Sequence, residues 1–236
     1  TFGGVYLSTN QGTSFSRQSN SPNIVESCCG GFNGTNQSNY DLAIGVSHSN
    51  RLNVVTGGIR ACRSTTGGIT WSNASGDNCN AESQSTGFVH ADVHDVEYNP
   101  LNGHVYLGSD GGLVKSTNDG IDWTNLSDGI ATSQAYHMAG SLLDIDHMMI
   151  GLQDNGCKRR DANTNVWDST IGGDGFDCIY DWDSSTSGYA TSNSKIYRFE
   201  DNGDTNTEIT GDSNQFFTRV TCAIDDPAVV LAGLND

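Results

Sequence analysis

The amino-acid sequence predicts an all-β fold, and three observations support this prediction. Turn-forming residues recur about every eight to twelve residues along the 236-residue chain, which is the spacing of short antiparallel strands. Glycine is abundant, at 29 residues, and proline is rare, at 3, so the turns are made by Gly, Asn, Asp and Ser. No stretch has the apolar periodicity of a long amphipathic helix. A hydrophobic content of 35% is enough for strands that are buried on alternate positions.

Three ungapped segments repeat one eight-residue pattern. They cover residues 8–15, 64–71 and 116–123, and their starts are 56 and 52 residues apart. Each follows a strand that contains glycine, and each has the composition of a tight turn. Small polar residues bend the chain, Gly takes the positive-φ position, and Ser with Asn or Asp bonds the turn amides. We expect the aromatic residue that closes each segment to begin the next strand and to pack inward.

These segments resemble the Asp-box, S-x-D-x-G-x-T-W, which recurs in sialidases, sortilin-type propellers and related secreted repeat proteins. Asn10, Thr66 and Asn118 stand where the box has Asp, and Phe15 stands where it has Trp. The resemblance implies a β-propeller of four-stranded antiparallel blades, with the boxes as structural hairpins on its rim. The residues that form these structural positions are Ser8, Asn10, Gly12, Phe15, Ser64, Gly68, Trp71, Ser116, Asn118, Gly120 and Trp123.

The repeat divides the chain into about five blades' worth of strands. We expect residues 1–236 to be a single propeller domain or an internal fragment of one. The expected parts are a half-blade at 1–25, blades at approximately 40–75, 88–130, 134–170 and 176–212, and a half-blade at 215–236. The two half-blades could close a five-bladed ring. We favour instead a stretch of a larger propeller, because larger rings are usual among Asp-box proteins.

A more specific resemblance covers residues 89–175. His90-Ala91-Asp92-Val93-His94-Asp95, Gly108-Ser109-Asp110-Gly111-Gly112 and Gln153-Asp154-Asn155-Gly156 lie in this part of the chain. The segment resembles secreted bacterial repeat proteins with sortilin-like propellers, which are common in Bacteroidetes. That resemblance implies an extracellular propeller of a kind usually described without a proven activity.

The charge of the chain excludes two classes of partner. There are 28 Asp and Glu against 11 Lys and Arg, which gives a formal net charge of −17. Such a surface repels phosphate backbones, so nucleic acid is not expected as a partner. No apolar run approaches the roughly 20 residues of a membrane helix, so direct membrane insertion is not expected either. The remaining partners are a protein or glycan ligand, or other copies of this chain. Without an initiator Met at Thr1, we expect a mature chain or an internal piece.

Seven cysteines, at positions 28, 29, 62, 79, 157, 178 and 222, bear on localisation. They form no C-x-x-C pair of the kind that binds zinc, so we interpret them as disulfide-forming residues. Disulfides predict a secreted or cell-surface location. The spacing favours Cys62 with Cys79 and Cys157 with Cys178 as pairs.

One candidate metal site is a row of polar residues, His90, Asp92 and His94, which alternate along a predicted strand and would share one face. Imidazole ligands would favour zinc or copper. At ~3.3 Å per residue, His90 and His94 would lie about 13 Å apart, so at most two neighbours could chelate together. The alternative is a hydrogen-bonded polar cluster that lines a channel or fixes a blade edge.

Carboxylates beside glycines form a second group of candidates. Asp110, Asp154 and Asp174 stand at what we expect to be equivalent strand ends, near Gln153 and Asn155, while Asp95 ends the polar row that begins at His90. Together they could bind Ca²⁺ or another divalent metal, or could serve as the acid and base of a glycosidase. Alternatively, each Asp-Gly pair only makes a turn. No cofactor is certain from the sequence.

Three functions remain open. The leading hypothesis is a secreted or cell-surface, non-enzymatic propeller for ligand binding, adhesion or surface assembly. The alternatives are a glycoside hydrolase with paired Asp residues and a structural subunit of an extracellular layer or filament. A sialidase is disfavoured, because the eight arginines are scattered. Trp167 and Trp182 could each offer a sugar-stacking surface.

Overall fold

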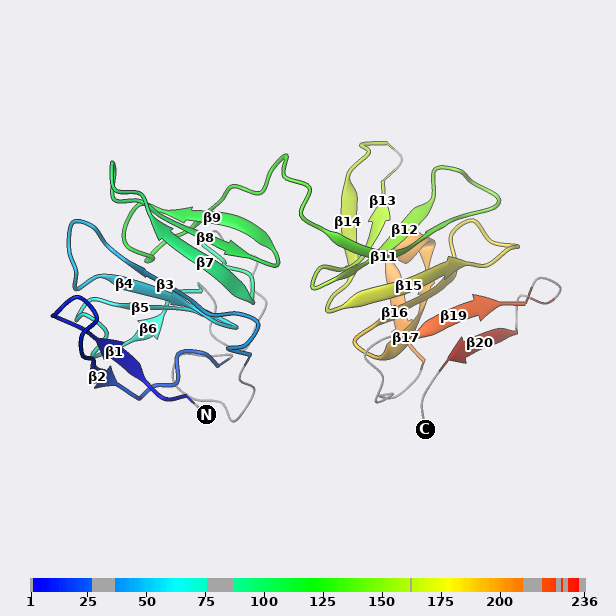
Figure 1. The fold of residues 1–236 in the computed structure, drawn as a ribbon. Helices are drawn as coiled ribbons and strands as arrows, with labels where there is room; N and C mark the ends of the chain where they lie inside the picture. The colour runs from blue at the N-terminus through cyan, green and yellow to red at the C-terminus, as the bar shows by residue number, and fades with distance from the viewer. Residues whose placement is uncertain are drawn as a thin grey trace. The chain divides into compact units, whose positions relative to one another are not determined.

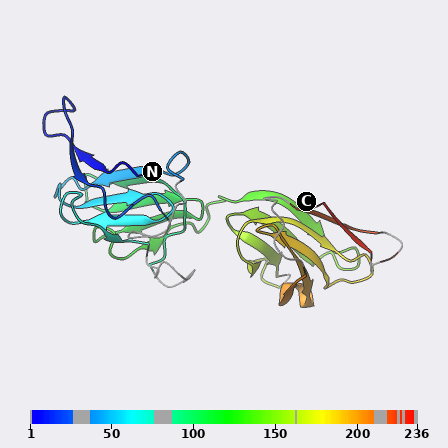
Figure 2. The same ribbon diagram turned by 90° about the horizontal axis from the view of Figure 1, so that it is seen from below.

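A computed structural model of the chain describes residues 2–26, 37–75, 87–161, 163–209, 218–223, 226 and 229–233. It divides into two compact units, Thr1–Thr132 and Ser133–Asp236. Both are built from antiparallel sheets whose strands follow one another in chain order, so neighbouring strands are joined by short turns. Figures 1 and 2 show the sheets of each unit in two views.

The first unit holds a two-stranded sheet and two four-stranded sheets. The two-stranded sheet is β1 (Val5–Leu7) and β2 (Ser16–Ser19). The first four-stranded sheet is β3 (Ala43–Val46), β4 (Val54–Gly57), β5 (Ala61–Ser64) and β6 (Ser72–Asn73). The second is β7 (Val93–Tyr98), β8 (Val105–Ser109), β9 (Gly112–Ser116) and β10 (Thr124–Asn125).

The second unit holds two four-stranded sheets and a two-stranded one. The first sheet is β11 (Gln134–Gly140), β12 (Met148–Gln153), β13 (Gly156–Arg160) and β14 (Trp167–Ile171). The next is β15 (Gly175–Tyr180), β16 (Gly188–Ser192), β17 (Lys195–Glu200) and β18 (Thr205–Glu208), with a 3₁₀ turn, η1 (Asp201–Gly203), before β18. The last sheet is β19 (Arg219–Cys222) and β20 (Val230–Gly233).

These sheets are the blades of a β-propeller, so the predicted fold class is confirmed. Each complete blade is a four-stranded antiparallel meander, the repeating unit of that fold. Among the described residues no helix is long and apolar enough to cross a membrane.

Face-to-face packing of neighbouring blades builds the core of each unit. In the first unit β3 lies against β7, and a Cβ at Gly45 would come within 2.8 Å of a Val96 methyl and 2.9 Å of its carbonyl oxygen. In the second unit a Cβ at Gly151 on β12 would collide with the backbone of Phe176 on β15. Glycine at both positions therefore allows the blades to approach closely.

The three repeated turns (residues 8–15, 64–71 and 116–123) share one hydrogen-bond pattern. The hydroxyl of the first residue accepts from the amide of the fifth: Gly12 N to Ser8 at 2.9 Å, Gly68 N to Ser64 at 3.0 Å, Gly120 N to Ser116 at 2.9 Å. The oxygen of the third residue, from Asn10, Thr66 or Asn118, accepts from the amide of the seventh at 2.9 Å in every copy. The pattern therefore needs an acceptor at the third position, which Asn or Thr supplies without the charge of Asp.

Two of the three closing aromatic residues pack inward as expected. Trp123 is 4% exposed and donates its indole N–H to the Ala74 carbonyl in the preceding blade, at 2.6 Å. Trp71 likewise donates to Ser19 of the preceding sheet, at 3.1 Å. For Phe15 the expectation is wrong, since its exposed fraction is 64%. Phe15 belongs to the first sheet in the chain, so the described residues include no preceding sheet against which its ring could pack.

The cysteines differ from the predicted pairing. Cys157 and Cys178 are both free thiols and fully buried. The Cys157 thiol on β13 donates to the Thr191 carbonyl at 3.6 Å, and the Cys178 thiol on β15 donates to the Met149 carbonyl at 3.2 Å. The predicted Cys157–Cys178 disulfide is therefore wrong: both thiols lie in the same core, but each one points to a different carbonyl. Cys62 is disulfide-bonded, and its partner lies outside the described residues, as do Cys28, Cys29 and Cys79.

The repeated turns predict unequal costs for one substitution. Ser116→Ala removes the acceptor of the Gly120 amide at a site that is 1% exposed, so we expect a loss of about 1–3 kcal/mol from the free energy of unfolding. Ser8→Ala removes the same bond in an exposed turn, where water replaces the hydroxyl, and we expect a loss of about 0.5 kcal/mol or less. Chemical denaturation followed by tryptophan fluorescence measures both losses. Equal losses would contradict this account.

The buried thiols predict a labelling pattern. Burial raises the pKa of Cys157 to about 12 and also raises that of Cys178, so neither forms the reactive thiolate at neutral pH. We expect iodoacetamide to leave both unmodified in the native protein and to alkylate both after denaturation without a reductant. Cys62 is expected to resist alkylation until a reductant is added. Peptide mass spectrometry reads all three sites, and a Cys157–Cys178 cross-linked peptide would overturn this prediction.

Candidate functional site

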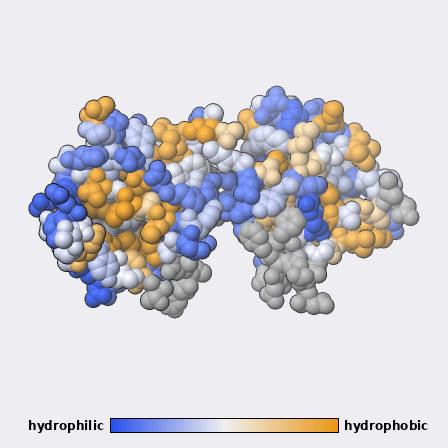
Figure 3. Space-filling model, viewed as in Figure 1, coloured by the Kyte–Doolittle hydropathy of each residue, from blue (hydrophilic) through white to orange (hydrophobic). Residues whose placement is uncertain are grey.

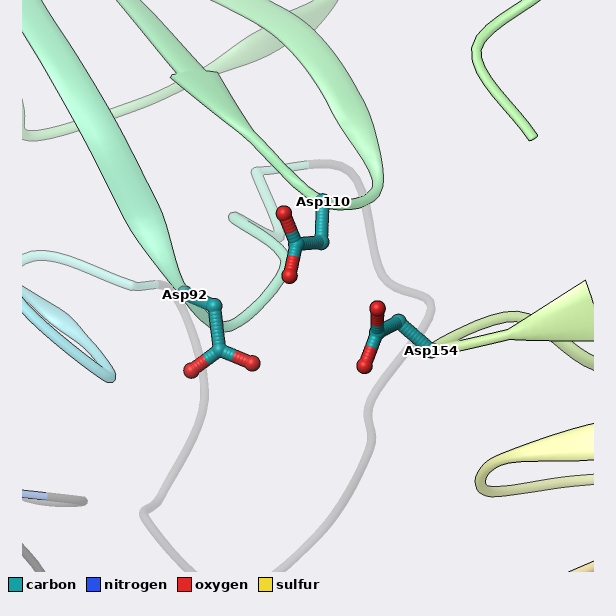
Figure 4. A group of neighbouring side chains, drawn as sticks. All are labelled: Asp92, Asp110 and Asp154. Carbon is teal, nitrogen blue, oxygen red and sulfur yellow. The ribbon is translucent and has the colours of Figure 1, made fainter. Parts of the chain in front are cut away.

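Three carboxylates gather at one end of the blades of the first unit. Asp41 immediately precedes the β3 region, Asp92 immediately precedes β7, and Asp110 lies in the turn between β8 and β9. Asp92 and Asp110 each offer an oxygen within 4.8 Å of the other's, and the Asp110 amide donates to the Asp92 carbonyl at 3.2 Å. Figure 4 shows the carboxylates of Asp92 and Asp110 at the same end of their blade. We call Asp41, Asp92 and Asp110 the carboxylate cluster.

Neighbouring polar side chains hold two of the three carboxylates. Gln37 donates its amide N–H to Asp92 at 2.9 Å. Tyr40 donates its hydroxyl to Asp110 at 3.1 Å, and His94 Nε2 lies 2.7 Å from the other oxygen of Asp110. The rings of Tyr40 and His94 also meet edge to face, with centroids 4.8 Å apart. Asp110 is therefore fixed from two sides.

Asp41 has a different kind of partner. It is fully buried and no N–H group bonds its oxygens, but its carboxyl is hydrogen-bonded to the carboxyl of Asp92. Burial raises the pKa of Asp41 to about 7, and the negative charge of Asp92 adds to that rise. The pKa of Asp92 is raised as well, by burial first and then by Asp110. The raised pKa allows Asp41 to hold a proton near neutral pH, which lowers the cost of burying it.

The polar row predicted from His90 to His94 is not a strand face. Strand β7 begins only at Val93, and Asp92 has a positive φ of 60°, so the chain turns between the two histidines. His90 instead packs where a Cβ of Gly111 would stand, with its ring edge-on to Phe88. His94 occupies a bulge in the β7–β8 pairing, and Asp95 beside it is exposed. In the described parts of the chain, no group of three metal-ligating side chains includes a histidine.

The predicted site residues of the second unit lie in turns. Asp154, which Figure 4 also draws, has a φ of 61° between β12 and β13, and its amide donates to the Asp174 carboxylate at 2.9 Å. Asp174 in turn receives the Asn193 amide on its carbonyl and donates its own amide to the Asn193 side chain. Gln153 accepts from the Tyr136 hydroxyl at 2.9 Å, and Asn155 bonds the Gln153 carbonyl. These contacts join the β12–β13 turn to the β16–β17 turn.

The second unit also contains a pocket of about 490 Å³ that the sequence did not reveal. The first strands of three successive sheets line it, namely β11 with His137, β15 with Asp177 and β19 with Arg219. Ile179 and Leu231 add apolar walls. The volume suits a small molecule, since ligand pockets commonly measure about 300–1,000 Å³. We call it the inner-strand pocket.

A buried carboxylate organises this pocket. Asp177 has a side chain that is only 3% exposed, and its two oxygens accept from the amides of Cys178 at 3.1 Å and Val220 at 3.0 Å. His137 Nδ1 lies 2.7 Å from Asp177, which places the proton on Nδ1 and leaves Nε2 as the free ring nitrogen. Asp177 is thus fully satisfied, and it fixes the orientation of the imidazole at the pocket.

Arg219 completes the polar side of the pocket. Its guanidinium lies 3.7 Å from Asp177, and its side chain is 56% exposed. At this distance the charges of the guanidinium and the carboxylate attract each other without a close hydrogen bond. The pocket therefore offers an arginine, an oriented imidazole and apolar side chains.

Sequence reasoning missed Asp41, His137, Asp177 and Arg219. One local signal existed for Asp177, because it stands among the apolar residues of 176–179, where a charged residue is unexpected. The partners of His137 are 40 and 82 positions away, so no spacing in the sequence connects them. Of the two tryptophans that could stack on a sugar, Trp167 is 37% exposed, while Trp182 has a buried indole N–H without a partner.

Comparisons with known proteins add little about function. No family model matches the chain, and no curated protein matches it. Among solved structures, a GH74 xyloglucanase from Xanthomonas campestris is 15% identical, with a TM-score of 0.31 over 72% of this chain and 30% of that one. The GH74 enzyme of Niastella koreensis is 15% identical, with a TM-score of 0.30 over 76% and 32%.

A third similar structure is the extracellular domain of a protein assigned as a hybrid two-component system from B. thetaiotaomicron. It is 11% identical, with a TM-score of 0.30 over 73% of this chain and 25% of that one. The chain thus spans about a third or less of the length of these three structures. At such scores they assign neither an activity nor a ligand.

The buried carboxylate of the inner-strand pocket can be tested directly. Asp177→Asn keeps the shape but turns one acceptor oxygen into an N–H group that faces a donor, and it leaves His137 without its anionic partner. We expect a loss of about 1–3 kcal/mol in the free energy of unfolding. We also expect faster hydrogen exchange at the Val220 amide. Mass spectrometry of peptides that contain β19 measures the exchange. Asp183→Asn, at an exposed carboxylate in the same unit, is the matched control and should change neither quantity.

Proposed function

We propose that this chain is part of a secreted or cell-surface propeller that binds a ligand without catalysing a reaction, and that the ligand occupies the inner-strand pocket. The observation that carries this proposal is the combination of Arg219 and an oriented His137 at a concave surface with apolar walls. Small-molecule sites commonly consist of an apolar pocket with a few fixed polar groups.

The lining of the pocket indicates a ligand with a carboxylate on a small apolar body. A guanidinium is a good partner for a carboxylate because its planar donors can bind both oxygens. The free Nε2 of His137 can share that contact when it is protonated. Ile179 and Leu231 then cover the apolar part of the ligand. None of the described residues that line the pocket is a Phe, Tyr or Trp, which favours such a ligand over a stacked neutral sugar.

The proposed location and family rest on separate observations. A disulfide at Cys62 is expected in an oxidising compartment, and a net charge of −17 suits a soluble surface domain. The hydrogen bonds shared by the three repeated turns support the assignment of these turns as Asp-boxes. We infer on that basis a sortilin-like propeller of the secreted bacterial type.

A glycosidase has less support than a binding protein. Such an enzyme needs two carboxyl groups that reach the scissile bond from an open cleft. The Asp174 carboxylate accepts from the Asp154 amide within a turn, and Asp41 is fully buried, so neither carboxyl lies where it could reach a substrate.

A pair of small molecules tests the proposal. Hexanoate carries a carboxylate on an apolar tail, and hexanamide has the same shape without the charge. We expect hexanoate to bind the whole chain with a dissociation constant on the order of millimolar, because it has only a few atoms to contribute. Hexanamide should bind at least about tenfold more weakly, since the charge-assisted bond to Arg219 is lost. Two-dimensional NMR titration reads both affinities.

Matched arginine variants locate the site. Arg219→Gln removes the proposed ligand donor and should weaken hexanoate about tenfold, whereas Arg51→Gln removes the same charge at an exposed turn of the first unit and should have no effect. Equal binding of hexanoate and hexanamide would refute the carboxylate preference. An equal loss in both arginine variants would show that only the net charge matters.

A further inference from the structure

One face of the sheet formed by β3 to β6 is covered only in part. Ile44 on β3 pairs with Thr56 on β4, and Thr56 pairs with Cys62 on β5, so the three side chains lie on the same face. Cys62 is fully buried and Thr56 is 3% exposed, but Ile44 is 58% exposed. Leu42 and Val46 alternate with buried residues on the same side as Ile44 and are 61% and 46% exposed. We call Leu42, Ile44 and Val46 the β3 row; the cover on this face ends before it reaches them.

The first sheet of the chain, β1 with β2, supplies the existing cover. Cys62 lies in a buried cluster against which Val5 of β1 packs. Ser19 of β2 accepts the indole N–H of Trp71, which stands just before β6, at 3.1 Å. The first sheet thus lies over the outer strands β5 and β6. In the described part of the chain, no strand pairs with the other edge of β1.

The repeated turns show which positions in a blade β1 and β2 occupy. The turns at 64–71 and 116–123 join the third and fourth strands of their sheets, β5 with β6 and β9 with β10. The turn at 8–15 joins β1 with β2, so these two strands are a third and a fourth strand. First strands pack on first strands, as β3 does on β7 and β11 does on β15. A first and a second strand added beside β1 would therefore cover the β3 row.

The chain carries such a pair of strands in the sheet of β19 and β20. Strand β19 packs against β15, which is the first strand of its own sheet, so β19 holds the first position. Among the described residues, β20 pairs with β19 alone. Val229, next to β20, is 44% exposed, and Leu231 is 64% exposed. Leu231 pairs with Thr221, so it lies on the other face of this sheet from the buried Val220. This sheet therefore has an available edge and apolar side chains on its exposed face.

We propose that copies of this chain associate head to tail: β20 of one copy pairs with the edge of β1 in a second copy, and the sheet of β19 and β20 covers the β3 row there. The joined sheet has the order β19-β20-β1-β2 and is the same antiparallel meander as the complete sheets. Main-chain hydrogen bonds along β1 and burial of the β3 row drive the association. The contact joins two different surfaces, so further copies add until a ring closes. The proposal does not rest on the ligand of the inner-strand pocket.

The mass of the whole chain in solution, measured by sedimentation, tests the association. We expect a single chain at about 1 µM and more than twice that mass at about 200 µM, since a small interface supports a dissociation constant on the order of 10 µM. Raising NaCl from about 0.05 M to about 0.5 M should strengthen the association, because salt screens the repulsion between copies of net charge −17. Hydrogen exchange in peptides that contain β1 should slow as the concentration rises. A single chain at the highest concentration and salt would overturn the proposal, and so would exchange at β1 that is independent of concentration.

Charged substitutions locate both surfaces. Ile44→Lys places an ammonium group in the β3 row and should weaken the association at least about tenfold. Val229→Lys does the same beside β20, and it is chosen because Leu231 also borders the inner-strand pocket. Leu101→Lys adds the same charge at a side chain that is 94% exposed between β7 and β8, and it should leave the association unchanged. All three positions are exposed, so the variants should fold; circular dichroism checks this, and Ile44→Thr replaces Ile44→Lys if that variant does not fold.

A mixture of variants distinguishes this contact from other modes of self-association. Ile44→Lys keeps an intact sheet of β19 and β20, and Val229→Lys keeps an intact β3 row. At a concentration where the wild-type chain associates, each variant alone should remain a single chain, whereas an equal mixture should form a dimer of the two. A symmetric dimer or non-specific clustering would give no such recovery, and its absence would overturn the proposal. An equal loss in Leu101→Lys would do the same. A wild-type chain that stays single while β1 exchanges slowly would show that another segment occupies that edge, and it would also overturn the proposal.

Discussion

The close packing of each blade on the next is the constraint on which the rest of the structure depends. A four-stranded sheet has two faces, and in each unit a neighbouring sheet buries one of them. Gly45 against Val96 and Gly151 against Phe176 show how near the backbones come, because neither position has room for a Cβ. Some apolar side chains remain exposed in the described part of this unit: Leu42, just before β3, alternates with Ile44 and Val46 on one face, and Figure 3 shows apolar surface on this unit. Packing of this kind buries one face of strands such as β7 and β15, so every polar group on that face needs a partner.

The two most buried carboxylates near these strands meet that need in different ways. Asp177 receives two backbone N–H groups and the imidazole of His137, so its charge is satisfied and helps to form the wall of a pocket. Asp41 is at least as well buried, and its carboxyl pairs with that of Asp92 instead of with an N–H donor. The same constraint therefore yields one carboxylate that is bonded by amides and one carboxyl that is bonded to another acid.

What the sequence could predict depends on the range of the interaction. The repeated turns were predictable because their internal hydrogen bonds run between residues two to four positions apart, as in Ser116, Asn118 and Gly120. The four-stranded blades follow from those turns and from the period of the repeat. The polar row was mispredicted because nothing local indicates that Asp92 adopts a positive φ or that β7 carries a bulge at His94. The inner-strand pocket was missed because its polar residues come from three different sheets. Contacts between sheets depend on tertiary packing, and the spacing of residues along the sequence gives no indication of them.

The repeated turns also help to distinguish acidic residues that serve the turns from acidic residues that have another role. At the third position of the repeated turns, Asn10, Thr66 and Asn118 make the bond that an Asp would make. A neutral acceptor suffices there, and in a chain with a net charge of −17 it avoids adding to the repulsion. The Asp174 carboxylate accepts from the Asp154 amide, so its role lies within the turns. Asp41 makes no turn bond with its side chain; its carboxyl is hydrogen-bonded to that of Asp92, which also accepts from Gln37. A proton held between the two carboxyls lowers the cost of burying two acids side by side, so this pair belongs to the packing of the blades rather than to the turns.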